Sequence, residues 1–289
     1  MIYLILSILI SSSLYVIFKL FDVFKVNTFQ AIVINYIVAF VIGYGYSDVK
    51  MSLSVIPQQN WFYGALILGF LFITIFNVMA ITSQRNGLSV ASVSGRMAVV
   101  IPIVFGIVMY NETVSVVKVI GIILALVAVY LTSVKSNQSK RFEGSSLLLP
   151  IILFLGSGAI DTLLKYTELN FVPEESVSIF SAYIFGIAFV FGMLFLGYQI
   201  IIKKEKFELK SIIGGIALGI PNYFSIEFLI RALKIKGIES SVLFTINNVS
   251  IVLLTTLFGL FLFKEKLENK NWLGILIAIV SILLITNKV

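Results

Sequence analysis

Long apolar runs, each bounded by Gly, Asn, Pro or charged residues, fill most of the chain. A helix that crosses a bilayer needs about 20 predominantly apolar residues, and the runs have about this length. We therefore predict ten membrane-spanning helices, at residues 2–20, 28–46, 61–84, 89–110, 116–134, 147–167, 176–202, 211–234, 238–263 and 271–287. The first run has no basic residue before Lys19 and no small-residue cleavage site, so we expect a retained helix rather than a signal peptide.

Composition supports the same fold class. Of the 289 residues, 59% are apolar and 12% are charged, whereas an average soluble domain is roughly half apolar and about 25% charged. A water-soluble globule is therefore excluded, and the short connections leave no room for a separate soluble domain. The sequence predicts an all-α membrane protein.

An internal repeat divides the chain. Residues 1–134 and 147–289 each hold five predicted spans, with a polar linker at 135–146. The halves match at three offsets, which differ only by small insertions in the connections. At 153 positions the matched pairs are Gly106 with Gly259, Glu112 with Glu265, Gly121 with Gly274 and Ala125 with Ala278. At 150 positions they are Gly64 with Gly214, Gly69 with Gly219 and Gly87 with Gly237, and at 146 positions they are Lys19 with Lys165 and Asp22 with Glu168. Because five is odd, two joined copies enter the membrane in opposite orientations. We predict two inverted five-helix repeats, an architecture typical of secondary transporters.

Two segments carry a family resemblance. YNETVSVVKVIGIILALVAVYL (110–131) and FKEKLENKNWLGILIAIVSILLI (263–285) resemble the Glu, short turn and Gly-rich last helix that close each half of EamA-like members of the drug/metabolite transporter superfamily. The resemblance extends to chain length, span number and the five-plus-five duplication. It implies a central cavity surrounded by helices one to four and six to nine, with helices five and ten at the periphery.

Missing residue types narrow the chemistry. The chain contains no Cys and no His, which excludes disulfides, thiolate or imidazole metal sites and histidine-based catalysis. We expect no metal and no cofactor, and no Walker-type sequence indicates ATP hydrolysis on this chain. The net charge of +7 is typical of cytoplasmic loops in membrane proteins, so nucleic-acid binding is not expected.

Arg96 is the strongest candidate for substrate binding. A charge at the centre of a membrane helix costs at least about 2.5 kcal/mol, so it needs a partner, water or a function. Arg96 lies in the small-residue stretch SVASVSGRMA, where its guanidinium suits a carboxylate or phosphate. The alternative is that it pairs with an acidic side chain or extends to the membrane interface.

Asparagines supply the other substrate-binding candidates. The repeat alignment places Arg96 opposite positions 246–249, which include Asn247 and Asn248. Hydrogen bonding between helices is the alternative role for such residues. The further candidates inside spans are Asn222, Asn77 and Asn35.

Two carboxylates in the spans are candidates for proton coupling. Desolvation favours the neutral form of a buried carboxylate, which can then take up and release a proton. Glu227 is the first candidate and Asp161 the second. Each also has a cation four residues on, Arg231 and Lys165, so internal ion pairs are the alternative.

Prolines and small residues predict local backbone features. Pro102 and Pro221 each remove a backbone donor inside a span, so we predict interrupted helices that line a cavity, with a simple kink as the alternative. Gly121 and Gly274, with their small neighbours, predict close helix packing. Glu112 and Glu265 are expected to stabilise the starts of the fifth and tenth helices.

Together these features predict a secondary transporter, an exporter or exchanger of a small polar or amphipathic metabolite such as an amino acid or organic anion, working by alternating access. It is therefore not expected to be an enzyme. The alternatives are a membrane-embedded lipid-modifying enzyme and a non-transporting membrane sensor or assembly protein. The expected partners are a small-molecule substrate and the lipid bilayer, with possible proton coupling, and the oligomeric state stays open, a monomer included.

Loop charge predicts the orientation. Thirteen Lys and Arg residues lie on the side of the connection between the first two spans, and seven lie on the other side. The positive-inside rule then places a multi-pass protein in the cytoplasmic (inner) membrane with both termini outside the cytoplasm. The family resemblance implies the reverse, with both termini inside. We favour the charge count because it uses this sequence directly.

Overall fold

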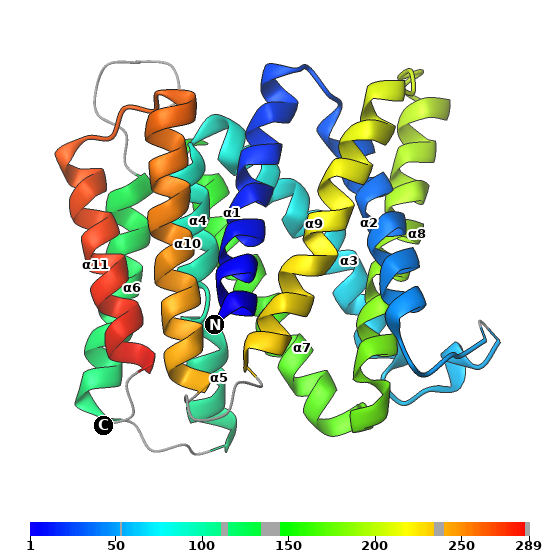
Figure 1. The fold of residues 1–289 in the computed structure, drawn as a ribbon, viewed down its shortest axis with the longest axis horizontal. Coiled ribbons are helices and arrows are strands. Elements are labelled where there is room, and N and C mark those ends of the chain that lie inside the picture. Colours follow the sequence, from blue (N-terminus) through cyan, green and yellow to red (C-terminus); the bar gives the residue numbers. More distant parts are fainter. Residues whose placement is uncertain (53, 111–114, 134–144, 234–239, 287–289) are drawn as a thin grey trace. The chain divides into compact units, whose positions relative to one another are not determined.

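A computed structural model of the chain describes residues 1–52, 54–110, 115–133, 145–233 and 240–286. Every regular element within these residues is a helix, and no strand forms among them (Figure 1). The predicted all-α fold is therefore confirmed.

The long helices follow the predicted spans. Their bounds are α1 (Ile2–Val23), α2 (Thr28–Tyr46), α3 (Phe62–Arg85), α4 (Leu88–Met97), α5 (Val100–Tyr110), α6 (Val116–Ser133), α7 (Ser145–Phe171), α8 (Val177–Ile201), α9 (Leu209–Leu233), α10 (Ser240–Phe263) and α11 (Asn269–Thr286). Two short 3₁₀ turns, η1 (Ile56–Gln58) and η2 (Glu174–Ser176), precede α3 and α8. Each of the ten predicted spans coincides with a helix or, for the fourth span, with the pair α4 and α5.

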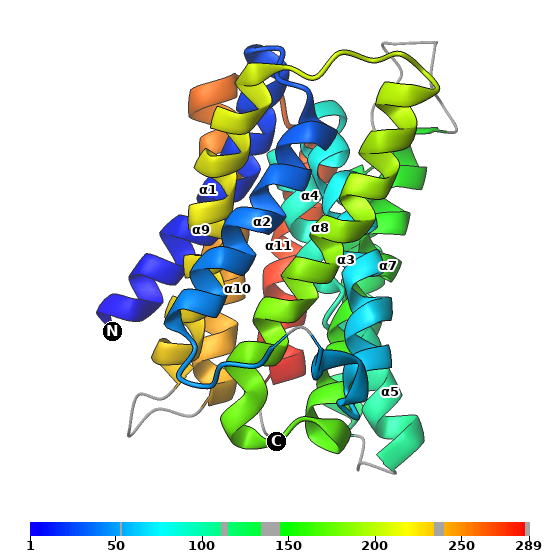
Figure 2. The same ribbon diagram turned by 90° about the vertical axis from the view of Figure 1, so that its right-hand side faces the viewer.

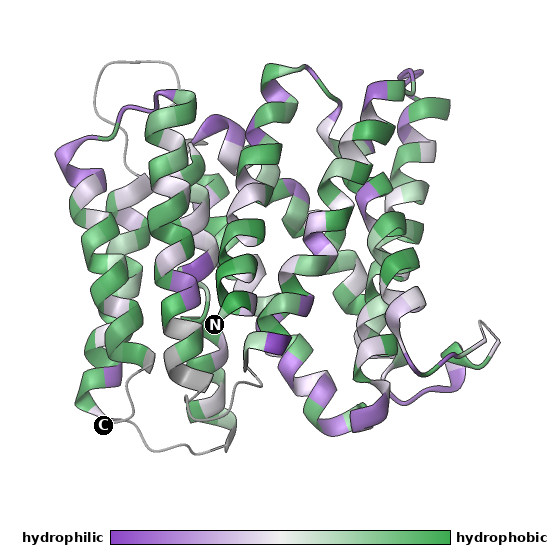
Figure 3. Ribbon diagram, in the orientation of Figure 1, coloured by the Kyte–Doolittle hydropathy of each residue, from purple (hydrophilic) through white to green (hydrophobic). Residues whose placement is uncertain are grey.

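Length and hydropathy define the class of protein. In the part of the chain that the structure describes, nine spans are long and apolar enough to cross a bilayer, counting α4 and α5 as one, and α11 is a slightly shorter apolar helix. Hydrophobic residues run along the helices, while hydrophilic residues gather in many of the connections (Figure 3). The chain is a multi-pass helical membrane protein.

Helix α6 shows how such a helix is built. It buries the small residues Gly121, Ala125 and Ala128 and exposes Ile123 and Leu126, each by more than half. Large aliphatic side chains on the outside need lipid as their solvent, whereas small residues on the inside let another backbone approach closely. That neighbour is α11, which runs beside α6 (Figure 1).

The fourth span is broken, as the proline in it predicts. Helix α4 ends at Met97 and α5 begins at Val100. The ring of Pro102 clashes with a helical carbonyl four residues earlier, at Ala98, which is where the break lies. The Ile101 amide donates to the Ala98 carbonyl at 2.9 Å, a tighter turn that partly satisfies the break.

The eighth span differs from its prediction. Helix α9 continues through Pro221 from Leu209 to Leu233, so the predicted interruption does not form. A proline inside a helix removes one hydrogen bond, and this loss bends a helix more often than it ends one. The backbone therefore agrees with the alternative, in which Pro221 at most kinks a helix that continues past it.

The helices form two compact units. Unit 1 consists of Met1–Lys19, Val78–Ala159 and Phe224–Val289, and unit 2 consists of Leu20–Asn77 and Ile160–Tyr223. Each unit takes segments from both halves of the sequence. In unit 2, α2 and α8 pack side by side (Figure 2).

Candidate functional site

A polar stripe on α4 faces α10 within unit 1. Ser92 and Arg96 are spaced four residues apart, which puts them on one face of the helix. The hydroxyl groups of Ser92 and Thr255 are hydrogen-bonded at 2.7 Å, and both residues are buried. The Nη1 of Arg96 donates to the Oδ1 of Asn248 at 3.2 Å. The sequence alignment of the halves had placed Asn248 in the window opposite Arg96.

The guanidinium of Arg96 keeps unused hydrogen-bonding capacity. Its Nε is fully shielded from solvent and has no hydrogen-bond partner among the described residues. The Tyr15 hydroxyl lies beside this group: it interacts with Arg96, and a Cβ built on Gly95 would lie 3.4 Å from it. No carboxylate in the described part of the chain forms an ion pair with Arg96. Its positive charge is therefore balanced by no acidic side chain there.

The two neighbouring asparagines have different surroundings. Asn248 contacts Arg96, whereas the Oδ1 of Asn247 accepts a hydrogen bond from the Ser7 hydroxyl at 3.3 Å. The same hydroxyl is 3.2 Å from the backbone carbonyl of Ser225. For Asn247 the alternative of hydrogen bonding between helices therefore describes the contact, while Asn248 belongs to the Arg96 cluster.

The remaining asparagine candidates lie in unit 2. The Nδ2 of Asn222 donates to the Oδ1 of Asn35 at 3.1 Å, and both residues are buried. Asn77 is half-buried on α3. The structure thus brings Asn35 together with Asn222, and it places these three asparagines in a different unit from Arg96.

The two candidates for proton coupling, Glu227 and Asp161, have different surroundings. The Nε of Arg231 donates to Glu227 Oε1 at 2.7 Å, so the predicted i,i+4 pair is confirmed. The guanidinium of Arg231 also lies over the ring of Tyr3, 5.7 Å from its centre. Asp161 and Lys165 are both exposed on α7. The Glu227 carboxylate is thus held in an ion pair, which is the alternative that its spacing from Arg231 allowed.

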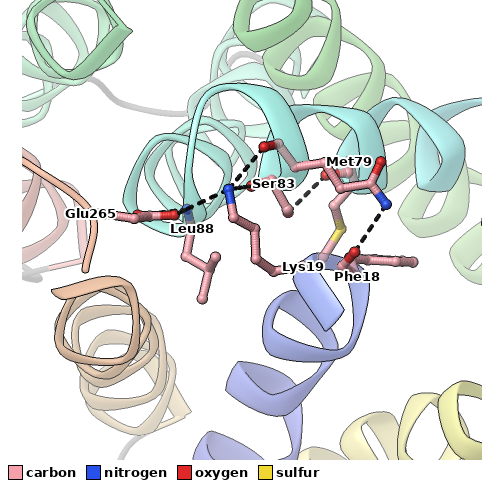
Figure 4. Close-up of polar contacts among 7 residues, drawn as sticks. Phe18, Lys19, Met79, Ser83, Leu88 and Glu265 are labelled. Atoms are coloured by element: carbon pink, nitrogen blue, oxygen red, sulfur yellow. Dashed lines mark hydrogen bonds and ion pairs between the residues drawn. The ribbon is translucent and has the colours of Figure 1, made fainter. Parts of the chain in front are cut away.

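Sequence reasoning missed a second charged cluster in unit 1, which Figure 4 shows. Lys19, near the end of α1, lies 3.7 Å from the carboxylate of Glu265, and both side chains are largely buried. The Nζ of Lys19 also donates to the backbone carbonyls of Gln84 at 2.8 Å and Ser83 at 3.4 Å. The Leu88 amide donates to both Glu265 oxygens at 3.1 Å.

This cluster corrects the predicted role of Glu265. The carboxylate does stabilise a helix start, but the helix is α4 rather than α11, which begins at Asn269. Its predicted counterpart Glu112 lies outside the described residues. The repeat alignment singled out both residues, since Lys19 matches Lys165 and Glu265 matches Glu112. It contained no information that Lys19 and Glu265 contact each other.

The described residues contain no group of three or more acidic side chains able to hold a metal ion. Arg96, Asn248 and Tyr15 offer instead a charged donor, an amide and a hydroxyl. Such a set can bind an anion or a polar group by hydrogen bonds.

Part of the chain is similar to a known bacterial protein. No family model matches the chain. An uncharacterized protein from Haemophilus influenzae (strain ATCC 51907 / DSM 11121 / KW20 / Rd) is 29% identical over 160 residues, which is 55% of this chain and 53% of that protein. The chain thus matches about half the length of this curated relative.

Proposed function

We propose that the protein is a secondary transporter of a small polar or amphipathic metabolite, an amino acid or organic anion, and that it belongs to the drug/metabolite transporter superfamily. The observation that carries the proposal is Arg96, a cation inside a broken membrane helix with an unused buried donor and no acidic partner among the described residues. Since membrane burial of an unpaired charge is costly, a bound anionic group gives the residue a function.

Reciprocal contacts in unit 1 support the inverted repeat. A Cβ built on Gly121 would lie 2.7 Å from Ile285, and one built on Gly274 would lie 2.8 Å from Thr132. Gly121 matches Gly274 at the offset of 153 positions, and Thr132 matches Ile285 at the same offset. Replacing each residue by its counterpart in the other half therefore turns one contact into the other, as a two-fold axis would.

Unit 2 has reciprocal contacts of its own. Gly43 meets Ala182 and Gly192 meets Val33, and these contacts exchange at an offset of 149 positions. Two further pairs of contacts exchange at offsets between 146 and 150 positions: Gly64 with Thr167 and Gly214 with Phe21, and Gly69 with Ile187 and Gly219 with Val38. Each unit thus supports the repeat independently.

The direction of these pairs supports inversion. Gly121, near the start of α6, contacts Ile285, near the end of α11, whereas Thr132, near the end of α6, contacts Gly274, near the start of α11. The two helices are therefore antiparallel, and a two-fold axis that exchanges them runs across them, in the plane of the membrane. This is the symmetry of inverted-repeat transporters, in which one site is exposed alternately to each side.

In this proposal Arg96 holds the anionic group of the substrate, and Asn248 orients the guanidinium. Asn247, which is also in unit 1, remains a candidate for orienting this substrate. Asn35, Asn77 and Asn222 belong to unit 2, and their predicted substrate-binding role is separate from the Arg96 cluster. Glu227, although paired with Arg231, stays the first candidate for a coupling proton, and Asp161 stays the second.

Solute flux tests the proposal directly. The purified chain in sealed proteoliposomes should exchange at least one radiolabelled member of a panel of amino acids and organic acids, at a rate well above that of empty liposomes. A lipid-modifying enzyme would turn over a lipid instead, and a sensor or assembly protein would move no solute. Absence of flux across the whole panel, with the protein folded and inserted, would overturn transport of this substrate class.

Orientation is tested separately. We expect alkaline phosphatase fused after Val289 to be active in a Gram-negative host, because the charge count places the C-terminus in the periplasm. A green fluorescent protein fusion at the same position should be dark. The reverse pattern would favour the orientation that the family resemblance implies.

A further inference from the structure

The charged cluster at the start of α4 has no part in substrate binding as proposed above. It joins three segments of unit 1: the end of α1, the turn from α3 to α4, and the connection from α10 to α11. Its side chains, Lys19 and Glu265, are only 18% and 13% exposed. An ion pair shielded to this degree is screened less than a surface pair, so it can hold the three segments together.

Two glycines form a socket for the carboxylate. A Cβ on Gly87 would lie 2.8 Å from Glu265 Oε2, and a Cβ on Gly259 would lie 2.5 Å from the same atom. Gly87 also has a φ of 105°, which other residues rarely adopt. We refer to Lys19, Gly87, Gly259 and Glu265 together as the junction.

Every member of the junction recurs in the other half of the sequence. At the offsets of the repeat, the corresponding residues are Lys165, Gly237, Gly106 and Glu112. In an inverted repeat, corresponding positions lie at opposite faces of the membrane. Lys165 is exposed on α7, whereas Lys19 is largely buried in its ion pair. The two copies of the lysine are thus in different environments in this structure.

We propose that the junction is a latch, which closes unit 1 at its own membrane face and must open during each transport cycle. This inference rests on the proposed function. Opening withdraws the Glu265 carboxylate from the Leu88 amide and so frees the start of α4, the short helix that carries Arg96 two turns later. Release of the latch is thereby linked to the position of the residue that binds the substrate.

The natural absence of cysteine makes the test direct. Ser89→Cys places a single thiol on α4 beside Leu88, at a position that is 2% exposed. In sealed vesicles, a membrane-impermeant maleimide added at the face of the junction should label it slowly. Adding Glu265→Gln should raise the labelling rate at least tenfold, because glutamine keeps an oxygen for the Leu88 amide but loses the charge. Lys19→Met should act in the same direction.

The control is Glu205→Gln, which removes an exposed carboxylate from the connection between α8 and α9. It should leave the labelling rate unchanged. Equal rates in Glu265→Gln, Lys19→Met and the parent, each eluting as a single folded species, would overturn the latch. An equal increase in Glu205→Gln would overturn it too.

Labelling and flux separate the two proposals. Labelling needs no substrate, so unchanged labelling of both junction variants in a chain that transports normally overturns the latch alone. Absence of flux from the parent chain for the whole solute panel overturns the proposed function, whatever the labelling shows.

Discussion

Replacing Arg96 with alanine should lower counter-flow of an anionic substrate by roughly 30-fold or more. Truncating one partner of a buried, hydrogen-bonded charge pair costs about 2 to 5 kcal/mol, and each 1.4 kcal/mol is a factor of about ten in affinity. Counter-flow in proteoliposomes and ligand-induced thermal stabilisation in detergent both measure this loss. Asn248→Ala should cause a smaller loss, because it leaves the charge in place and removes one hydrogen bond.

The same substitution should not destabilise the fold. In the described structure Arg96 has no acidic partner, so no ion pair is lost, and removing a charge from the membrane interior offsets the loss of the hydrogen bond to Asn248. Arg96→Ala should therefore melt at the same temperature as the parent, or higher, while it loses ligand stabilisation. Arg231→Gln is the matched control: this guanidinium is already paired with Glu227, so anion binding should persist. Unchanged counter-flow in Arg96→Ala would refute the assignment.

A second large effect is expected at the glycine contacts of unit 2. Gly219→Ala would place a methyl group 2.7 Å from Val38 Cβ and 2.8 Å from the backbone oxygen of Asn35. Backbone atoms do not move aside as a flexible side chain does, so the helices must separate at an expected cost of about 1 to 3 kcal/mol. Thermal or denaturant unfolding of the purified protein measures this loss.

Gly197→Ala on α8 is the matched control, because a Cβ built there meets nothing within 4 Å. Alanine is favoured over glycine inside a helix by roughly 0.5 to 1 kcal/mol, so this variant should be as stable as the parent or slightly more stable. Similar melting temperatures for the two alanine variants would show that the α9 contact tolerates a side chain and would contradict the packing described above.

Local features of this fold were predictable from the sequence. Span length and hydropathy depend on neighbouring residues, and α2 begins and ends where the apolar run from 28 to 46 does. The effect of Pro102 was also local, since its ring acts on the preceding turn. Pro221 looks the same in sequence, yet α9 passes through it. Neighbouring helices decide whether a proline bends or ends a helix, and their contacts are not local.

The candidate site was predictable only in part. The repeat alignment placed Arg96 opposite a window of four positions, and tertiary packing chose Asn248 within it. Asn247 and Asn248 are adjacent, so about 100° of helical rotation turns one toward Arg96 and the other toward Ser7. The Lys19–Glu265 pair joins segments far apart in the chain. Hydropathy carries no information about such partners, so the sequence did not pair these two side chains.

The break between α4 and α5 also fixes the depth of Arg96. Helix α4 has 10 residues, or about 15 Å at 1.5 Å per residue. This is half of the roughly 30 Å hydrocarbon core, so an α4 that starts at one membrane face and runs along the bilayer normal carries Arg96 to about the midplane. A unit charge crossing the whole membrane gains or loses about 2.3 kcal/mol per 100 mV. In the proposed transporter, an anion that reaches Arg96 from one side crosses about half the electric field, so its affinity should change roughly sevenfold for each 100 mV of membrane potential.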